Sequence, residues 1–597
     1  MGSINTSIKG GEFLIRELAT SELFIPEDFT EEQKMIEQTC ADFIKTEITP
    51  ILNEIDDAKD NSLMSGLMDK AGALGLLGTS VPEEYGGFGM DFNTSMLVAE
   101  ACGSGHSFAV ALSGHTGIGT LPILYYGTEE QKQQYLPKLA SGEWKAAYCL
   151  TEPDSGSDAN AAKSKAILNE AGTHYVINGQ KMWITNGGFA DLFIVFAKID
   201  QDKTLTAFLV EKSFPGITMN EEEHKMGIKG SSTRQVFFND CLVPVENLLF
   251  KREGGFKIAV NILNIGRIKL AAAVMGGSKR VIDAAAKYSD DRKQFGVSLH
   301  TFGAIQHKLA EMVIKTYATE SACYRAGQDI DNSILGLKSA GLSDTNAKLK
   351  GVEQFAIECA ILKVHASEVL DYVVDEGVQI FGGMGFSADA PMERSYRDSR
   401  INRIFEGTNE INRLLAVGTV LKRAMKGELD IMSPAMQVGK EILSVPDFNR
   451  SLGEGTFSKE REVLKNLKKA ILLAAGAALQ KFTVQIEKEQ EILMAIADMM
   501  IEVYVAESAL VRAEKLIEKN GEEKALIQKE CALVYLHHAV EIVAKQGREV
   551  ILGFATGDEL NVLLLGLKRF TKIDPKNLIQ ARRTIAQALI EKKAYNL

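Results

Sequence analysis

The spacing of hydrophobic positions divides the chain into helical, strand-rich and again helical stretches. Residues 28–147 carry mostly helical periodicity, interrupted by Gly- and Pro-rich turns. From 148 to 245 the pattern shortens to runs of β-branched and aromatic residues typical of a compact barrel or sandwich. Helical periodicity returns over 256–425 and again over 459–597. This order predicts an α+β chain with segregated helical and strand domains.

The strongest local signal in the strand-rich stretch is Asn178-Gly179, placed between Tyr175–Ile177 and Lys181–Ile184. Asn-Gly accepts the positive φ angles of a tight turn, so the pattern predicts a hairpin at these two residues. The domain boundaries predicted from pattern alone are a flexible tail (1–27), a helical domain (28–147), a β domain (148–250), a helical domain (251–425), a linker with a short helix (426–458) and a further helical domain (459–597).

Composition excludes several classes of protein. The 597 residues are 45% hydrophobic and 24% charged, which argues against a disordered or fibrous chain. The net charge of −12 argues against nucleic acid as a partner. Seven cysteines without a C-x-x-C pair predict a reducing compartment, no disulfide framework and no metal site. No uncharged apolar run reaches membrane-spanning length and no import signal is present, so we expect a cytoplasmic protein.

Five segments carry residues suited to chemistry, although each has an ordinary structural alternative. Tyr148–Asp158 is a turn crowded with hydroxyls, and Lys181–Gly187 places Trp183 and Thr185 two apart in a strand. Asp290–Gly296 and Gln379–Phe386 bring Arg, Phe and clustered Gly to helix ends. Arg403–Ile411 holds Glu406 between Phe405 and Gly407, a setting that favours a carboxylate base with a raised pKa.

Together, the five segments resemble the acyl-CoA dehydrogenase family in order and spacing, from about residue 30 to 425. The resemblance implies an N-terminal helical domain, a middle β-barrel domain and a C-terminal four-helix bundle, with Glu406 as catalytic base and FAD between the domains. The FAD contacts that it implies are Tyr148, Leu150, Thr151, Gly156, Ser157, Trp183, Ile184, Thr185, Arg292, Phe295, Gln379, Gly383, Thr408 and Glu410. The substrate contacts are Ser157, Asn264, Arg267, Phe405 and Gly407.

Two further features resemble the very-long-chain branch of that family, in a bacterial-type member. One is Asn264 ahead of the Gly266-Arg267 pair, and the other is the additional all-α domain after residue 459. The small residues of Gly103–Gly114 correspond to the far end of the acyl tunnel, which favours long chains.

The implied reaction is α,β-dehydrogenation of a fatty acyl-CoA, the first step of β-oxidation. Electrons would pass to an electron-transfer flavoprotein, and the protein would be a homodimer. An acyl-CoA oxidase and a non-enzymatic assembly role of the same fold are the alternatives. Membrane association through residues 426–458 is not favoured, because Glu428, Asp430 and Asp447 repel anionic lipid.

Overall fold

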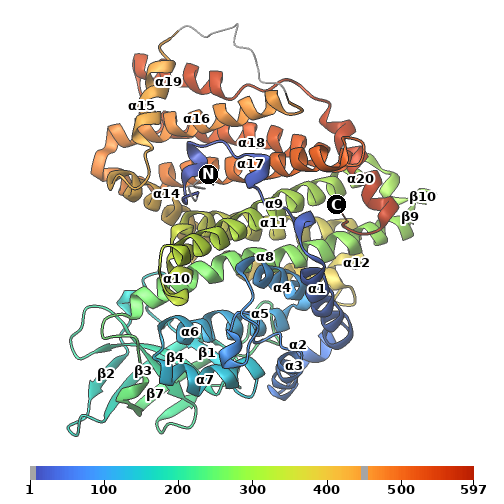
Figure 1. Ribbon diagram of the computed structural model, residues 1–597. Helices are drawn as coiled ribbons and strands as arrows, with labels where there is room; N and C mark the ends of the chain where they lie inside the picture. The colour runs from blue at the N-terminus through green and yellow to red at the C-terminus, as the bar shows by residue number, and fades with distance from the viewer. Residues whose placement is uncertain (1–7, 445–454, 597) are drawn as a thin grey trace.

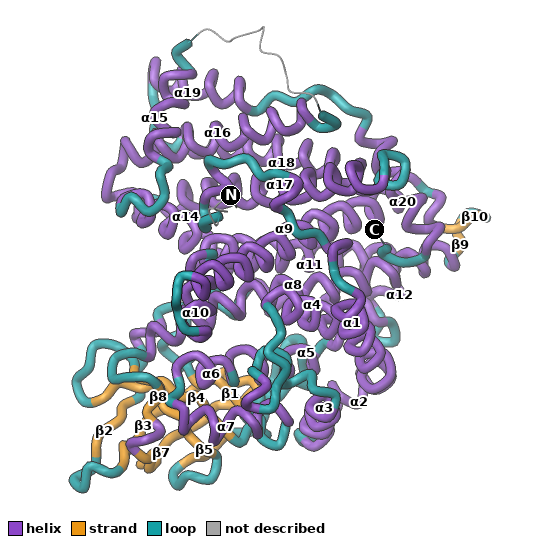
Figure 2. The backbone as a smooth tube through the Cα atoms, viewed as in Figure 1, coloured by secondary structure: helices purple, strands orange, loops and turns teal. Residues whose placement is uncertain are grey.

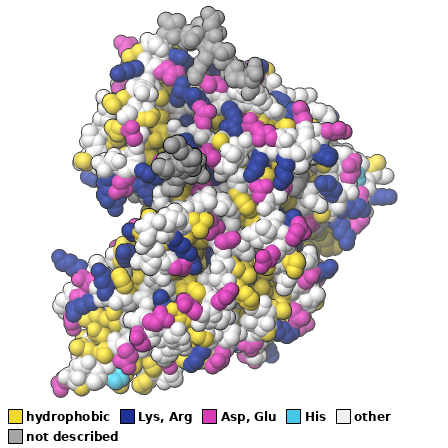
Figure 3. All heavy atoms as spheres, in the orientation of Figure 1, with side chains coloured by type: hydrophobic (Ala, Val, Ile, Leu, Met, Phe, Trp, Pro, Cys, Tyr) yellow, Lys and Arg dark blue, Asp and Glu magenta, His cyan; other side chains and the backbone are white. Residues whose placement is uncertain are grey.

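The molecule consists of long packed helices with one β domain at the lower end. A computed structural model describes residues 8–444 and 455–596. Figures 1 and 2 show the strands of the β domain at the lower end, around helices α6 and α7, and the C-terminal helices stacked at the opposite end. On the face seen in Figure 3, Lys and Arg side chains are interspersed with Asp and Glu.

The N-terminal helices pack against one side of the long central helices. They are α1 (Glu31–Phe43), α2 (Leu52–Asp57), α3 (Ser62–Ala73), α4 (Phe92–Cys102), α5 (Ser107–Ser113), α6 (Leu121–Tyr126) and α7 (Glu129–Ser141). Thr30 begins α1 as an N-cap whose hydroxyl accepts from the Gln33 amide, at 3.2 Å. A second hydrophobic cluster under α1, α3 and α5, including Phe43, Met68 and Phe108, holds these helices together.

The β domain is built on a sheet with the strand order β6-β7-β3-β2-β4-β5-β8, while β1 pairs in parallel with β4. Side chains from six strands, among them Ile177, Phe193, Phe208 and Val236, form one buried cluster, so the sheet curls around its own core. The strands are β1 (Ala146–Cys149), β2 (Lys165–Leu168), β3 (His174–Thr185), β4 (Leu192–Ile199), β5 (Thr206–Glu211), β6 (Ile217–Met219), β7 (Thr233–Pro244) and β8 (Leu248–Leu249).

The predicted hairpin at Asn178-Gly179 is wrong. Strand β3 runs through both residues, and its pairing with β7 shifts register between Ile177 and Gly179. A Cβ on Gly179 would lie 2.2 Å from the Ser164 hydroxyl, so glycine here allows a close approach within a bulge. The true hairpin joins β2 to β3 through Asn169–Thr173, where the Asn169 side chain accepts from the Thr173 amide.

Four long helices form the centre of the molecule: α8 (Gly255–Asp291), α9 (Gly303–Ser339), α11 (Ala356–Phe381) and α14 (Asn409–Met425). Shorter elements connect them: β9 (Lys293–Gln294), β10 (Val297–Ser298), α10 (Asp344–Gln354), α12 (Gly383–Phe386) and α13 (Pro391–Ser399). The predicted linker contains α15 (Met432–Glu441), and part of it lies outside the described residues. The C-terminal helices are α16 (Ser458–Phe482), α17 (Gln490–Asn520), α18 (Leu526–Leu552), α19 (Gly557–Phe570) and α20 (Leu578–Lys592).

The C-terminal helices are not a separate body. One hydrophobic cluster runs from Ile262 in α8 through Tyr317 in α9 to Leu467 in α16 and Tyr504 in α17. The expectation that the apolar stripe at Leu464, Leu467 and Ile471 is buried by the same chain is confirmed, since all three are 3% exposed or less.

The prediction of a flexible tail over 1–27 is wrong for residues 8–27. This strap, residues 8–27, lies along α16 and α17, with Leu18, Leu23 and Ile25 buried against Val511. Its Phe13 ring meets the Tyr504 ring edge-on at 4.9 Å. The strap forms short 3₁₀ turns of its own, and its apolar side chains fill a groove offered by other helices.

Two helical stretches, Ser107–Tyr126 and Gly255–Asp291, are long and apolar enough to cross a membrane. In each, 72% of the most apolar window is buried inside the molecule, as in core helices of the central bundle.

Candidate active site

Glu406 lies on the loop that joins the 3₁₀ turn Arg400–Arg403 to α14. Glu406 and Gly407 both have positive φ angles, 59° and 81°, which for Glu406 is a conformation that side-chain-bearing residues seldom adopt. Asn412 holds this backbone by donating to the carbonyls of Gly407 (2.8 Å) and Thr408 (3.0 Å). Such strain maintained by neighbours is typical of a functional site.

The carboxyl of Glu406 is desolvated without being paired. Its Oε2 is buried and makes no hydrogen bond in the described part of the chain. Burial raises the pKa of Glu406 from 4.5 to about 7, although the cations Arg267 and Lys363 act in the opposite direction. A carboxylate with this pKa is matched to proton abstraction near neutral pH.

Arg267 and Lys363 hold the loop rather than the carboxylate. The Arg267 Nε donates to the Glu406 carbonyl at 3.2 Å, and its Nη1 is fixed by the Asn264 Oδ1 at 2.7 Å. The Lys363 Nζ donates to the Gly407 carbonyl at 2.8 Å and to the Asn409 Oδ1 at 2.7 Å. The predicted substrate contacts Asn264 and Arg267 therefore lie beside Glu406, where the structure gives them the role of positioning its backbone.

Gly266 and Lys363 were missed by sequence reasoning. A Cβ on Gly266 would lie 2.7 Å from the Glu406 Oε2, so glycine at this position makes room for the carboxylate. In the sequence, the Gly266-Arg267 pair was the feature that could have drawn attention to Gly266. Nothing in the sequence places Lys363, deep in α11, against a loop more than forty residues later.

A cavity opens beside Glu406, and its empty space, including the part that is open to solvent, is about 1490 Å³. One stripe of α8 lines it from Gly266 to Val281, facing α4, α5 and the turn Gly114–Gly119. Phe405, a predicted substrate contact, and Thr185, a predicted cofactor contact, contribute to its wall. Of the segment Gly103–Gly114, most residues line the cavity, but Ala111 does not, because it is fully buried and its carbonyl accepts from Asn186 at 2.9 Å.

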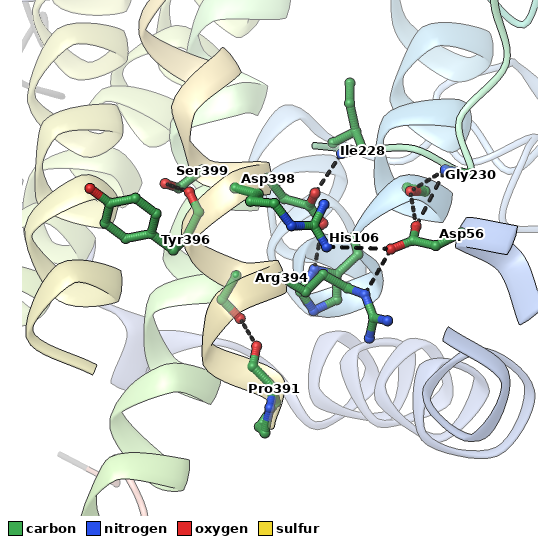
Figure 4. A network of polar contacts seen from close by, with 12 residues as sticks. Asp56, His106, Ile228, Gly230, Pro391, Arg394, Tyr396, Asp398 and Ser399 are labelled. Carbon is green, nitrogen blue, oxygen red and sulfur yellow. Dashed lines mark hydrogen bonds and ion pairs between the residues drawn. The ribbon is translucent and has the colours of Figure 1, made fainter. Parts of the chain in front are cut away.

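A polar network ties three parts of the chain together at the cavity wall (Figure 4). Asp398 of α13 lies between the His106 ring, at 2.9 Å, and the amide of Ile228 in the β domain. Asp56 binds Arg394 of α13 at 2.8 Å and accepts from the Gly230 amide at 3.3 Å. These contacts fix α13 against the N-terminal helices and the β domain.

The residues predicted to hold the ring half of FAD lie on and around β1 and β3. The Tyr148 hydroxyl is buried and has no protein partner in the described residues, and Trp183 is 52% exposed at a positive φ of 60°. An orphaned hydroxyl and an uncovered indole fit a flat polar ring bound against these strands. Leu150 and Ile184 are buried beneath this face, Thr151 is half-buried, and Gly156 and Ser157 are exposed in the following loop.

A buried ion pair that the sequence did not indicate fixes this face. The Lys181 Nζ lies 2.7 Å from the Glu152 Oε1 and also donates to the Leu150 carbonyl at 3.2 Å. Glu152 in turn accepts from the amide of Ser164 at 3.1 Å. The loop that carries Gly156 and Ser157 is therefore held at its base.

Thr408 and Glu410 mark the start of α14. The Thr408 hydroxyl accepts from the Ile411 amide at 3.3 Å as the N-cap, and Glu410 lies exposed in the first turn. Hydrogen bonding at the helix start lowers the pKa of Glu410, so it is not a second candidate base.

The structure does not bring the predicted adenine-side residues to Glu406. Arg292 and Phe295 follow the end of α8, and Phe295 is 93% exposed at the β9–β10 turn. Gln379 and Gly383 are exposed nearby, where Tyr288 stacks on Phe381 at 4.0 Å. The 25 residue steps from Gly266 to Asp291 in α8 correspond to roughly 38 Å, so the two sets lie at opposite ends of one helix.

Comparison with known proteins agrees with this arrangement. The N-terminal, middle and C-terminal domain models of acyl-CoA dehydrogenase match residues 30–143, 147–241 and 253–421, and a further acyl-CoA dehydrogenase C-terminal domain model matches 466–569. The chain belongs to the acyl-CoA dehydrogenase family. The resemblance found in the sequence is thus confirmed, as is the fold with its additional C-terminal helical domain.

Full-length relatives share the additional domain. The chain is 46% identical to a probable acyl-CoA dehydrogenase of Bacillus subtilis, over 99% of this chain and 98% of that one. It is 36% identical to the mitochondrial very long-chain specific acyl-CoA dehydrogenase of Bos taurus, over 87% of this chain and 80% of that one. A crystal structure of an acyl-CoA dehydrogenase from Bacillus anthracis, complexed with FAD, is 46% identical with a TM-score of 0.96, covering 99% of this chain and 100% of that one.

Proposed function

We propose that this acyl-CoA dehydrogenase uses FAD to oxidise long-chain fatty acyl-CoA to trans-2-enoyl-CoA and passes the electrons to an electron-transfer flavoprotein. The observation that carries the chain length is the cavity along α8. The fifteen residue steps from Gly266 to Val281 correspond to roughly 22 Å of helix. An extended chain advances about 1.2 Å per bond, so a chain of about 18 atoms fits this length.

Apart from Lys269 and Arg280, the α8 residues along that length are small or apolar. Ala273 and Gly277 of α8 line the cavity together with Gly103, Ala109 and Gly114. Small side chains leave the width that a methylene chain needs, and apolar walls favour its burial. The identity to the bovine very long-chain enzyme, at 36%, supports the same substrate class.

The residues around Glu406 account for proton abstraction. Glu406 accepts the α-proton, and its desolvated carboxylate is basic enough to do so near neutral pH. Its backbone N–H, which has no partner in the described residues, is available to the thioester oxygen, where such a donor stabilises developing negative charge. When bound, FAD supplies the acceptor for the β-hydride. Tyr148, Leu150, Thr151, Trp183 and Thr185 would hold its ring half.

A homodimer is part of the proposal. The adenine-side residues lie roughly 38 Å along α8 from Glu406, so they are useful only to a cofactor bound by another subunit. The exposed side chains of Phe295, Met384 and Phe386 at this end of the molecule are suited to contact such a partner. A cytoplasmic location remains a prediction.

Anaerobic titration of the purified flavoprotein with saturated acyl-CoAs of increasing length tests the substrate. We expect flavin bleaching to extend to long chains. Ala109→Leu should lower kcat/KM for long chains more than for short ones, because a larger side chain at this cavity-lining position would narrow the space for the chain. Ala111→Ser, behind the wall, is the matched control. Equal losses at all lengths would reject the assignment, and peroxide formation without a dye acceptor would indicate an oxidase.

A further inference from the structure

The cavity wall contains one lysine that the proposed reaction does not use. Lys269 of α8 lines the cavity one helical turn beyond Gly266, the residue that touches Glu406. Its Nζ makes one hydrogen bond, to the Ser80 hydroxyl at 3.2 Å. Within residues 8–444 and 455–596, no carboxylate forms an ion pair with it.

Lys269 differs in this from several other lysines in the interior, although Lys363 also lacks a carboxylate partner and instead makes two hydrogen bonds. Lys181 is paired with Glu152, Lys279 with Glu100 and Glu320, and Lys468 with Glu507. A buried charge without a counter-ion costs several kcal/mol, which is why buried lysines are normally paired. Burial lowers the pKa of Lys269 to about 8, and no nearby carboxylate offsets that shift, so the side chain is still largely protonated at neutral pH.

The position of Lys269 identifies what could pair with it. The side chain shares the cavity with the acyl chain, and the neighbouring Thr79 also lines that cavity. A lysine has a flexible four-carbon stem, so its ammonium can turn from Ser80 toward a group in the cavity. A plain alkyl chain has no acceptor for the ammonium, whereas a carboxylate on the chain would accept a charge-assisted hydrogen bond from it.

We infer that Lys269 is a specificity residue that binds the distal carboxylate of ω-carboxyacyl-CoA substrates. This inference rests on the proposed acyl-CoA chemistry and widens its substrate class. With alkyl substrates the ammonium stays on Ser80, and the chain passes it toward Val281. With ω-carboxyacyl-CoA of suitable length, the chain end stops at Lys269.

The test compares ω-carboxyacyl-CoAs with unsubstituted acyl-CoAs of matched, increasing length. In Lys269→Met, which keeps the side-chain length without the charge, kcat/KM for ω-carboxy substrates should fall roughly 10- to 100-fold at the preferred length. Unsubstituted chains should be unaffected or improved. Lys257→Met, an exposed lysine on the same helix, should change neither. Lys269→Arg keeps a cation and should keep most of the preference.

Calorimetric binding in the Glu406→Gln background gives a readout independent of turnover. There, adding Lys269→Met should weaken ω-carboxyacyl-CoA by the same factor and leave the alkyl analogue unchanged. An equal effect on both substrate types, or no binding of any ω-carboxyacyl-CoA by the parent, would overturn the inference. Failure of alkyl turnover together with intact, Lys269-dependent ω-carboxy binding would instead count against the proposed long-chain function.

Discussion

At the residue scale, burial and two nearby cations have opposite effects on the pKa of Glu406. Burial makes ionised Glu406 costly, while Arg267 and Lys363 limit the shift without forming an ion pair with the carboxylate. Both cations are occupied by loop carbonyls. The proposed base is thus held in place through its backbone, while its carboxylate stays unpaired in the described part of the chain.

Glu406→Gln should abolish dehydrogenation, because an amide cannot accept the α-proton, and it should also change stability in a pH-dependent way. The folded-state pKa of Glu406 lies above 4.5, so ionisation costs stability as pH rises from 4.5 to about 7. At pH 8 the variant should therefore be more stable than the parent, by at most about 3 kcal/mol. Denaturation at pH 5 and pH 8 measures this. A stability difference that is the same at both pH values would contradict the burial argument.

Gly266→Ala separates catalysis from folding. The added methyl group meets the mobile end of Glu406 rather than backbone, so the carboxylate can move aside at little cost in stability. We expect kcat to fall by about 10- to 100-fold with an unchanged melting temperature. Gly418→Ala, on α14 with open space around it, is the control for adding a methyl group to a helical glycine. Full activity in Gly266→Ala would show that the carboxylate needs no such room.

Lys363→Met addresses the pH profile. Removing this cation should raise the pKa of Glu406 further, so the acidic limb of kcat/KM moves to higher pH. It also leaves the Gly407 carbonyl without its donor, and some loss of stability is expected. Profiles of kcat/KM for parent and variant test the shift. If the acidic limb of the profile does not move, the limb reflects the titration of a group other than Glu406.

At the scale of elements, the strap of residues 8–27 joins the C-terminal helices to the catalytic bundle. The Gly11 amide donates to Glu358 of α11 at 2.7 Å, and Arg461 of α16 donates to the Leu18 carbonyl at 2.7 Å. Arg512 of α17 binds both Glu27 at the end of the strap and Glu320 of α9. The strap therefore bridges two helical layers that share one core.

Phe13→Ala should loosen that bridge. The ring is 3% exposed and packed against Tyr504, and removing a buried phenylalanine typically costs about 3–5 kcal/mol. We expect a lower melting temperature and faster proteolysis of the C-terminal helices. Met35→Ala, at a side chain that is 69% exposed, should stay within about 0.5 kcal/mol of the parent. If both variants melt alike, the strap contributes little.

At the scale of the whole molecule, the ring-side and adenine-side residues occupy opposite ends of α8. In the proposed homodimer, each chain would therefore contribute residues to two different cofactor sites. The C-terminal helices share a core with the bundle, so a chain ended near Met425 would expose residues such as Tyr317 and Ala318 that are fully buried here. For that reason the oligomeric state is better tested in the full chain by point variants.

Arg292→Ala and Glu406→Gln should complement each other. Each variant alone should be inactive, the first through lost FAD binding and the second through the lost base. In a homodimer with shared sites, each heterodimer has one complete site of two, so purified heterodimers should regain about half of the parent activity per dimer. Co-expression with two purification tags, followed by an activity assay per dimer, measures this. No recovery in verified heterodimers would reject a shared site.

The sequence by itself determined the family and the order of helical and strand domains, and it singled out Glu406 as the candidate base. These depend on local features: periodicity, and motifs whose residue types are tied to chemistry. It did not determine which residues meet Glu406, because Gly266, Lys363 and Asn412 reach it only through the packing of α8, α11 and α14.

Tertiary structure also decided the hairpin and the strap. Asn178-Gly179 has the composition of a turn, but pairing with β7 on one side and the approach of Ser164 on the other keep the strand extended. Residues 8–27 have no periodicity of their own, and a groove made by helices more than 400 residues away orders them. Short-range propensity is worth about 1 kcal/mol per residue, and long-range burial and pairing outweigh it wherever they are available.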